Sequence, residues 1–308
     1  MAEEYISTLQ KKLEDGHFVV CSEMGPPVGA DPDFIKNKAH KLKGYVDAVN
    51  ITDNQTAIVR MSSIAGAKIA TEEGLEMIIQ VTCRDRNRIG LQSDILGASS
   101  LGLRNALLLT GDHQVFGKDK GSKNVFDMGS VQLIQVASDM INKGVLLNGS
   151  EMEVPPKMFI GAAANPFADP FEMQMIKFSK KIEAGARFFQ TQAIYNIDKF
   201  KYWMEEVRKL GLHKKAYILA GILPTRSVKA LKMMKKFVAG MDIPDETIER
   251  MEAAEDRKAE GVKMAVETIE EVKKIEGVSG VHLMPVAWEE ITPVVVKNAG
   301  LYPRPEVD

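Results

Sequence analysis

Short apolar runs recur eight times along this chain, and a segment with helical character follows each of them. Every run ends in a polar residue or in a Gly/Pro turn. Eight alternating strand–helix units within about 300 residues are what a closed (β/α)8 barrel requires. We therefore predict an α/β fold, a TIM barrel, whose strands cover residues 18–23, 46–52, 77–82, 106–111, 158–164, 188–192, 216–221 and 280–285.

The length of 308 residues fits one barrel with extensions, because such a barrel needs roughly 250 residues. We expect a single catalytic domain over residues 1–308, with a short helix over 3–16 before the first strand. A Gly- and Lys-rich loop over 112–126 is expected to be mobile and able to fold over a site. The charged segment 244–277 predicts an extra solvent-facing helix before the eighth strand, or a helix pair broken near Gly261.

The formal net charge is −2, so the chain has no electrostatic signature of binding to nucleic acid or to an anionic membrane. No apolar stretch approaches the ~20 residues that a membrane span requires. The acidic start, Met1-Ala2-Glu3-Glu4, lacks the basic and apolar pattern of a signal peptide. We therefore expect a cytoplasmic protein with no nucleic-acid partner and no membrane span.

The chain carries none of the short motifs that mark common phosphate, metal or nucleophile sites. Neither Gly-x-Gly-x-x-Gly nor a P-loop occurs, and no nucleophile elbow is present. The five histidines lack metal-ligand spacing, and Cys21 and Cys83 lie in predicted strands without a Cys-x-x-Cys pair. We predict no metal site and two buried, unpaired cysteines.

Polar residues at the predicted strand ends are the candidates for chemistry, because TIM-barrel active sites lie at the carboxyl ends of the strands. These ends carry Glu23, Thr52, Gln80, Asp112, Asn165 and Gln192. Two carboxylates in one mouth, Glu23 and Asp112, tend to have their pKa values pushed apart, so that one stays ionised and the other can act as an acid. Structural roles stay open for both: a hydrogen bond in the mouth for Glu23, and a helix or loop cap for Asp112.

The sixth predicted strand contains two amide side chains that need partners. Strand alternation puts Gln190 and Gln192 on the same face. Because a buried amide without a hydrogen bond is costly, we expect a ligand or a water molecule to satisfy this pair.

Five ordered motifs at these strand ends resemble those of the methylenetetrahydrofolate reductase family. They are Ser22-Glu23-Met24-Gly25-Pro26-Pro27, Val81-Thr82-Cys83, Leu109-Thr110-Gly111-Asp112, Ala184-Gly185-Ala186-Arg187-Phe188-Phe189-Gln190-Thr191-Gln192 and Ala220-Gly221-Ile222-Leu223-Pro224. The similarity extends from about residue 14 to residue 302. Five motifs in order are a far more specific signal than any one of them alone.

The resemblance implies a flavin in the barrel mouth and the reversible conversion of 5,10-methylenetetrahydrofolate to 5-methyltetrahydrofolate. Glu23 matches the family's general acid, Asp112 its aspartate near flavin and pterin, and Gln192 its folate-binding glutamine. These types of side chain suit the chemistry. An acid promotes opening of the bridging methylene to an iminium cation, and an anion stabilises that cation.

By the same resemblance, the residues expected to contact the flavin are Thr52, Gln80, Thr110, Gly111, Asp112, Ala163, Asn165 and Lys181. Three of them depart from the family pattern. Gln80 stands where His is frequent, Thr110 where Arg is frequent, and Asn165 where Tyr is common. These departures reduce the contacts to the adenine half of FAD, so we expect either FAD or FMN. Lys181 matches a basic residue near the nucleotide part of the flavin, but it also fits a surface charge at a helix end.

The electron donor is a further point of departure. Val228 stands where many bacterial members of the family place a Phe that stacks on nicotinamide, and valine offers no aromatic face. We therefore expect weak or absent oxidation of NADH, with electrons supplied by a partner protein in an oligomer or complex.

Two other functions stay open. One is a pterin-binding barrel that transfers a one-carbon group without flavin, and the other is a non-catalytic or electron-relaying subunit that docks a partner. Schiff-base chemistry is less favoured, because no predicted strand carries an interior lysine.

Overall fold

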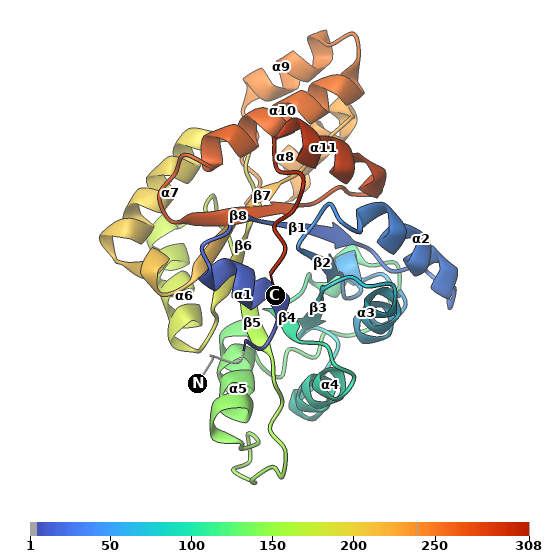
Figure 1. The fold of residues 1–308 in the computed structure, drawn as a ribbon, viewed down its shortest axis with the longest axis vertical. Coiled ribbons are helices and arrows are strands. Elements are labelled where there is room, and N and C mark those ends of the chain that lie inside the picture. Colours follow the sequence, from blue (N-terminus) through green and yellow to red (C-terminus); the bar gives the residue numbers. More distant parts are fainter. Residues whose placement is uncertain (1–4, 239, 308) are drawn as a thin grey trace.

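The computed structural model describes residues 5–238 and 240–307, and its centre is a closed barrel of eight parallel strands (Figure 1). Each strand pairs with its neighbours in sequence, and β8 closes the barrel on β1. The strands are β1 (Val19–Met24), β2 (Ala48–Ile51), β3 (Met77–Thr82), β4 (Asn105–Leu109), β5 (Phe159–Ala164), β6 (Phe188–Ala193), β7 (Tyr217–Ile222) and β8 (Val278–Leu283). The predicted TIM barrel is confirmed.

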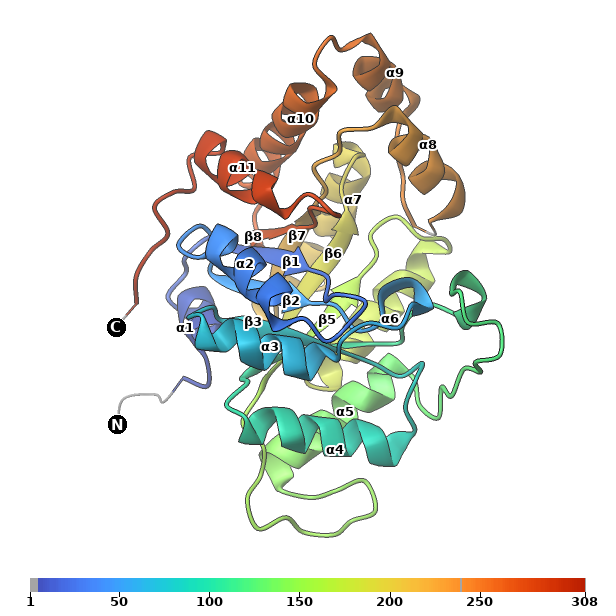
Figure 2. The same cartoon turned by 90° about the vertical axis from the view of Figure 1, so that its right-hand side faces the viewer.

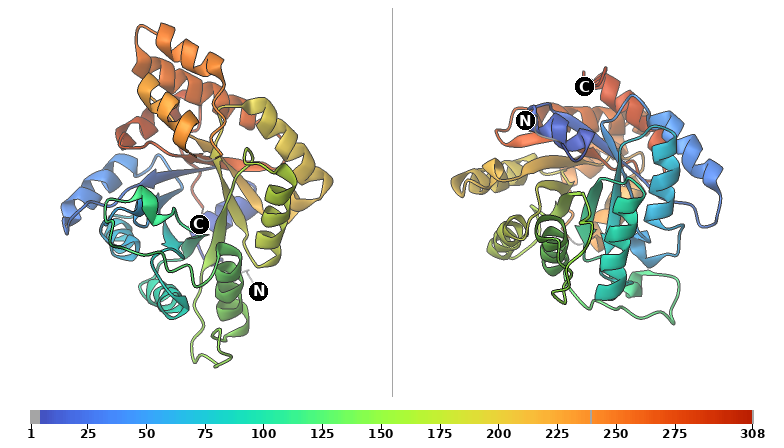
Figure 3. Two further views of the ribbon diagram at one scale, coloured as in Figure 1. Left: turned by 180° about the vertical axis from the view of Figure 1, so that it is seen from behind. Right: turned by 60° about the horizontal axis from the view of Figure 1, so that its bottom comes forward.

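Helices surround the barrel, as the two views of Figure 3 show. They are α1 (Thr8–Glu14), α2 (Pro32–Leu42), α3 (Ser63–Glu72), α4 (Arg88–Ser100), α5 (Ser130–Lys143), α6 (Phe171–Glu183), α7 (Ile197–Lys209), α8 (Val228–Phe237), α9 (Asp245–Ala253), α10 (Arg257–Val272) and α11 (Thr292–Asn298). Short 3-10 turns are η1 (Gln55–Ala57), η2 (Gln114–Phe116), η3 (Leu212–Lys214) and η4 (Glu289–Ile291). None of the helices in the described ranges is long and apolar enough to cross a bilayer.

The helix expected over residues 3–16 is shorter than predicted. It begins at Thr8, because the Ser7 side chain accepts a hydrogen bond from the Gln10 amide and caps the first turn. Residues 3 and 4 lie outside the described part of the chain. Leu9 and Leu13 of this helix pack beneath the barrel and close its amino-terminal end.

The barrel interior changes from apolar to polar along its axis. Beside α1 the inward side chains are apolar, and Phe159 stacks on Phe188 with ring centroids 5.1 Å apart. Above this layer, Asn50 and Gln190 exchange two hydrogen bonds of 2.7 and 2.8 Å across the interior. The polar mouth begins above this amide pair, at the carboxyl ends of the strands.

The charged segment before β8 folds as a helix pair, but the break is not at Gly261. Helix α9 ends at Ala253 and α10 starts at Arg257, so the turn lies several residues earlier. Gly261 lies inside α10, where a Cβ would come within 1.7 Å of the Thr225 carbonyl oxygen. The glycine permits a close approach of the helix to the β7–α8 loop, so the prediction of a break there is wrong.

The mouth and the closed end lie on opposite sides of the molecule. In Figure 2, α1 and the C-terminal tail are on the left, and the green segment 112–127 extends to the right. The loop over 112–126 is held at its end, because the amides of Val125 and Phe126 donate to the carbonyls of Arg84 and Cys83. Helices α8 and α9 project at the top, beyond the barrel strands (Figures 1 and 2).

Candidate active site

A cavity of about 560 Å³ opens at the carboxyl end of the strands. Every site residue expected from the sequence lines it: Glu23, Thr52, Gln80, Thr110, Gly111, Asp112, Ala163, Asn165, Lys181 and Gln192. They come from β1, β3, β5 and β6, from helix α6, and from the loops after β2, β4 and β5. Glu23 and Asp112 therefore open to the same end of the barrel.

Glu23 lies on β1 with its side chain 16% exposed. Gln80 Nε2 on β3 donates to Glu23 Oε2 over 3.0 Å, and His282 Nε2 on β8 lies 3.8 Å from the same oxygen. Among the described residues, Glu23 Oε1 has no hydrogen-bond partner in the protein. One carboxylate oxygen is thus oriented by the barrel, and the other is free for a ligand.

Asp112 lies at the exposed rim, directly after the turn that follows β4. Its Oδ2 accepts from the Thr56 amide over 3.2 Å, so the loop after β2 meets the loop after β4. Gly111 makes this turn with φ +87°, which a side chain would strain. An added Cβ would also lie only 3.0 Å from Thr82 Cβ. The local sequence Gly-Asp thus places a carboxylate at the rim.

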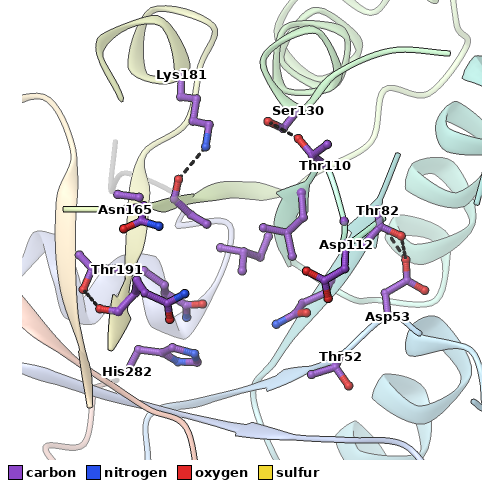
Figure 4. A pocket seen from close by; sticks show the side chains of 18 of the residues that line it. Thr52, Asp53, Thr82, Thr110, Asp112, Ser130, Asn165, Lys181, Thr191 and His282 are labelled. Atoms are coloured by element: carbon purple, nitrogen blue, oxygen red, sulfur yellow. Dashed lines mark hydrogen bonds between the residues drawn. The ribbon is translucent and has the colours of Figure 1, made fainter. Parts of the chain in front are cut away.

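Some polar side chains in the walls of the cavity have hydrogen-bond partners in the protein and others have none (Figure 4). Thr52 is buried, and its Oγ1 has no hydrogen-bond partner among the described residues. In contrast, Thr110 Oγ1 donates to Ser130 Oγ over 3.1 Å, and Asp53 accepts from the amide and the hydroxyl of Thr82. The Thr52 hydroxyl oxygen is shielded from solvent and lies near Gly25, where an added Cβ would be 3.7 Å from it, so it is a buried group without a partner beside the cavity.

Helix α6 supplies the cationic side of the cavity. Lys181 Nζ donates to the Ala163 carbonyl oxygen over 2.7 Å. Burial, with a smaller contribution from the neighbouring charge of Lys177, lowers the pKa of Lys181 to about 8. Lys177 also lines the cavity, one helical turn before Lys181. Lys181 is therefore half-buried at the site rather than a surface charge at a helix end.

The two amides of β6 differ in their surroundings. Gln190 is satisfied by Asn50, so the expectation that a ligand or water must satisfy it is wrong. Gln192 Oε1 accepts from the Ala193 amide over 3.0 Å, which leaves its NH₂ group toward the cavity without a protein partner among the described residues. Gln190 commits one amide N–H to Asn50, whereas no protein acceptor among the described residues takes either N–H of Gln192.

Sequence reasoning missed two functional candidates, His282 and Arg84. His282 is buried, lines the cavity, and its Nδ1 has no partner in the described ranges. The sequence does point to His282, because it is a polar residue between the apolar Val281 and Leu283 of the eighth strand. Strand alternation directs its side chain to the barrel interior. Arg84 follows β3, lines the cavity and is 1% exposed. The sequence did not indicate that Arg84 is buried, because a charged residue just after a predicted strand is usually exposed.

Both cysteines are buried and unpaired, as predicted. Burial raises the pKa of Cys21 far above its ordinary value and that of Cys83 to about 11, so neither thiol is a ready nucleophile. Across residues 5–238 and 240–307, no three His, Cys, Asp or Glu side chains cluster in a way that would hold a metal ion.

Known proteins resemble this chain over most of its length. A probable methylenetetrahydrofolate reductase (NADPH) of Caenorhabditis elegans is 23% identical over 96% of this chain and 44% of its own length. Methylenetetrahydrofolate reductase (NADH) 1 of Arabidopsis thaliana is 23% identical over 74% of this chain and 38% of its own. The chain thus spans about two-fifths of the length of these relatives.

Among solved structures, one similar fold is an uncharacterized protein from Clostridium thermocellum that binds two copies of 5-methyl-5,6,7,8-tetrahydrofolic acid. Its TM-score is 0.66 at 16% identity, with 95% of this chain and 98% of that chain covered. The family model of methylenetetrahydrofolate reductase matches residues 8–300. The chain therefore belongs to the methylenetetrahydrofolate reductase family.

Proposed function

We propose that this protein is a flavin-dependent oxidoreductase that interconverts 5,10-methylenetetrahydrofolate and 5-methyltetrahydrofolate. The observation that carries the proposal is Glu23, a carboxylate inside the cavity with one oxygen oriented by Gln80 and the other without a protein partner among the described residues. Asp112 at the rim of the same cavity supplies the second carboxylate. The solved relative that binds 5-methyltetrahydrofolic acid supports a pterin ligand for this barrel.

The cavity suits a flavin, FAD or FMN. Thr52 and Gly111 both line the cavity, and the Thr52 hydroxyl has no hydrogen-bond partner among the described residues. Lys181 offers a cation for a phosphate group. The residues that would hold the flavin are Thr52, Gln80, Thr110, Gly111, Asp112, Ala163, Asn165 and Lys181. When bound, a flavin supplies hydride transfer at this mouth.

The protein side chains then have distinct roles toward the folate. Protonated Glu23 donates its proton to the nitrogen that leaves when the five-membered ring of methylenetetrahydrofolate opens, and the bridging carbon becomes an iminium cation. Asp112 stabilises that cation as a pre-placed anion. The free NH₂ group of Gln192 hydrogen-bonds the pterin. Gln80 orients the Glu23 carboxyl group by its hydrogen bond, and His282 Nε2 borders the same oxygen at 3.8 Å.

The electrons come from a partner protein rather than directly from NADH. Helix α8 supports a protein electron donor. The helix begins at Val228, and Leu231 is its only buried residue. Its outer face exposes Met233 and Phe237 by 54% and 63%. Helix α8 itself carries no acidic residue and exposes Lys229 and Lys236, whereas its Lys232 and Lys235 pair with Glu252 and Asp245 of α9. Exposed Met and Phe among lysines are typical of a surface that binds an acidic protein.

The position of α8 fits electron delivery to the cavity. The segment after α8 contacts the rim, because a Cβ on Gly240 would come within 1.8 Å of the Asn165 amide nitrogen. Asn165 lines the cavity, so a protein docked on α8 would sit beside the mouth.

Stopped-flow reduction of the flavin-loaded protein by NADH tests the donor assignment. We expect slow reduction that does not saturate, whereas rapid, saturable reduction would contradict a protein donor. If the purified protein neither contains nor takes up flavin, the flavin-free one-carbon transfer function is favoured instead.

A further inference from the structure

Arg84 is a buried charge to which the proposed reaction gives no role. Its side chain follows β3, is 1% exposed and lines the cavity beside Asp112. A buried guanidinium is stable only when its donors and its charge are matched by nearby groups. The partners of Arg84 therefore indicate what it does.

Those partners connect three loops of the mouth. Arg84 Nε and Nη2 bind the two carboxylate oxygens of Asp85 over 2.8 and 2.7 Å. Nη2 also donates to the Asn54 carbonyl over 3.0 Å, and Nη1 donates to the Asp112 carbonyl over 3.3 Å. One side chain thus joins the loops that follow β2, β3 and β4, which are neighbours in the barrel.

The loop after β2 is the strained member of the three. Asn54, Thr56 and Ala57 have φ of 45°, 55° and 54°, in the left-handed region that residues other than glycine rarely occupy. This conformation directs the Thr56 amide at Asp112 Oδ2. Such strain persists only where surrounding contacts hold it, and the bond from Arg84 to the Asn54 carbonyl is one of those contacts.

We infer that Arg84 is a positioning residue for Asp112. It binds the Asp112 backbone directly, and through the Asn54 loop it holds the Thr56 amide that orients the Asp112 carboxylate. Four of its five N–H groups are engaged by protein acceptors, and Asp85 balances its charge, so it is not a binding group for an anionic substrate. This inference rests on the proposed function, in which Asp112 faces the substrate cation.

Arg84→Lys tests the inference, because lysine keeps the charge but cannot reproduce the planar fork. A matched control is Arg88→Lys, which removes a two-bond pair with Asp127 outside the cavity, where Arg88 is 53% exposed. We expect Arg84→Lys to lower kcat for methyltetrahydrofolate oxidation by about tenfold or more, with a much smaller change in KM. Arg88→Lys should leave both values near those of the wild type.

A double-mutant cycle separates positioning from a general loosening of the mouth. If Arg84 acts through Asp112, Arg84→Lys should lower the rate far less in the Asp112→Asn background than in the wild type. Equal factors in the two backgrounds would overturn the inference.

Hydrogen exchange provides a readout that does not need turnover. Peptides over residues 53–58 and 111–117 should exchange faster in Arg84→Lys than in wild type or Arg88→Lys, and unchanged exchange would again overturn the inference. Wild-type protein without any folate turnover would instead contradict the proposed function, while the exchange comparison would still decide whether Arg84 holds these loops.

Discussion

The two ends of the barrel both contain carboxylates, but the carboxylates at the two ends differ in their hydrogen-bond partners. At the closed end, Asp47 has a fully buried side chain whose oxygens accept from Lys12, Arg304 and the Val20 amide. At the mouth, Glu23 has one oriented oxygen and one without a protein partner in the described ranges. A carboxylate that accepts all of its hydrogen bonds from protein groups stabilises the fold. A carboxylate with one oxygen free of protein partners can instead act on a ligand.

The largest effect is expected at the closed end. Asp47→Ala would leave Lys12 and Arg304 without their buried anion, so the free energy of unfolding should fall by about 3–5 kcal/mol. Urea unfolding measures this loss, and the turnover of the remaining folded protein should be unchanged. A large fall in the turnover of Asp47→Ala without a fall in its stability would contradict a purely structural role for the closed end.

The mouth should show the opposite response. Glu23→Gln is expected to keep the fold and the flavin but to lower folate turnover by ~10²-fold or more, the usual scale for a general acid. Its matched control is Glu76→Gln at the closed end, where Glu76 accepts from Asn105 over 2.6 Å and burial raises the pKa of the carboxyl. Rapid-mixing assays of both variants should show the loss only for Glu23→Gln.

A smaller effect is expected at Lys181, where the pKa is lowered to about 8 by burial. The cationic fraction of this lysine falls as pH rises through about 8, so affinity for FMN should fall over the same range. Lys181→Gln should bind FMN about tenfold more weakly at lower pH and lose this pH dependence. Fluorescence titration measures both, with the exposed Lys180→Gln as control. A wild-type affinity that is flat across this range would contradict a phosphate contact.

Much of the fold was predictable because its signals are local. Eight apolar runs with polar ends specify parallel strands buried on both faces, and strand ends specify the mouth. The position of Gly261 did not predict the boundary between α9 and α10. This glycine lies within α10 and allows the helix to pack closely against Thr225 without a break.

The unpredicted parts of the site depend on contacts between distant segments. Gln190 is satisfied by Asn50, which lies on the opposite part of the barrel and far away in sequence. Arg84 is buried only because the loops after β2 and β4 provide carbonyl acceptors for it. Patterns within one segment cannot reveal such pairs, although His282 could have been found by extending strand alternation to β8.

Anaerobic mixing of the flavin-loaded protein with 5-methyltetrahydrofolate isolates the reaction between flavin and folate, because no electron donor is needed. We expect the flavin to be reduced as 5,10-methylenetetrahydrofolate forms, and Glu23→Gln to lose this reaction while retaining its flavin. A flavin that stays oxidised in the wild-type protein, or one that is reduced equally fast in Glu23→Gln, would contradict the proposed function.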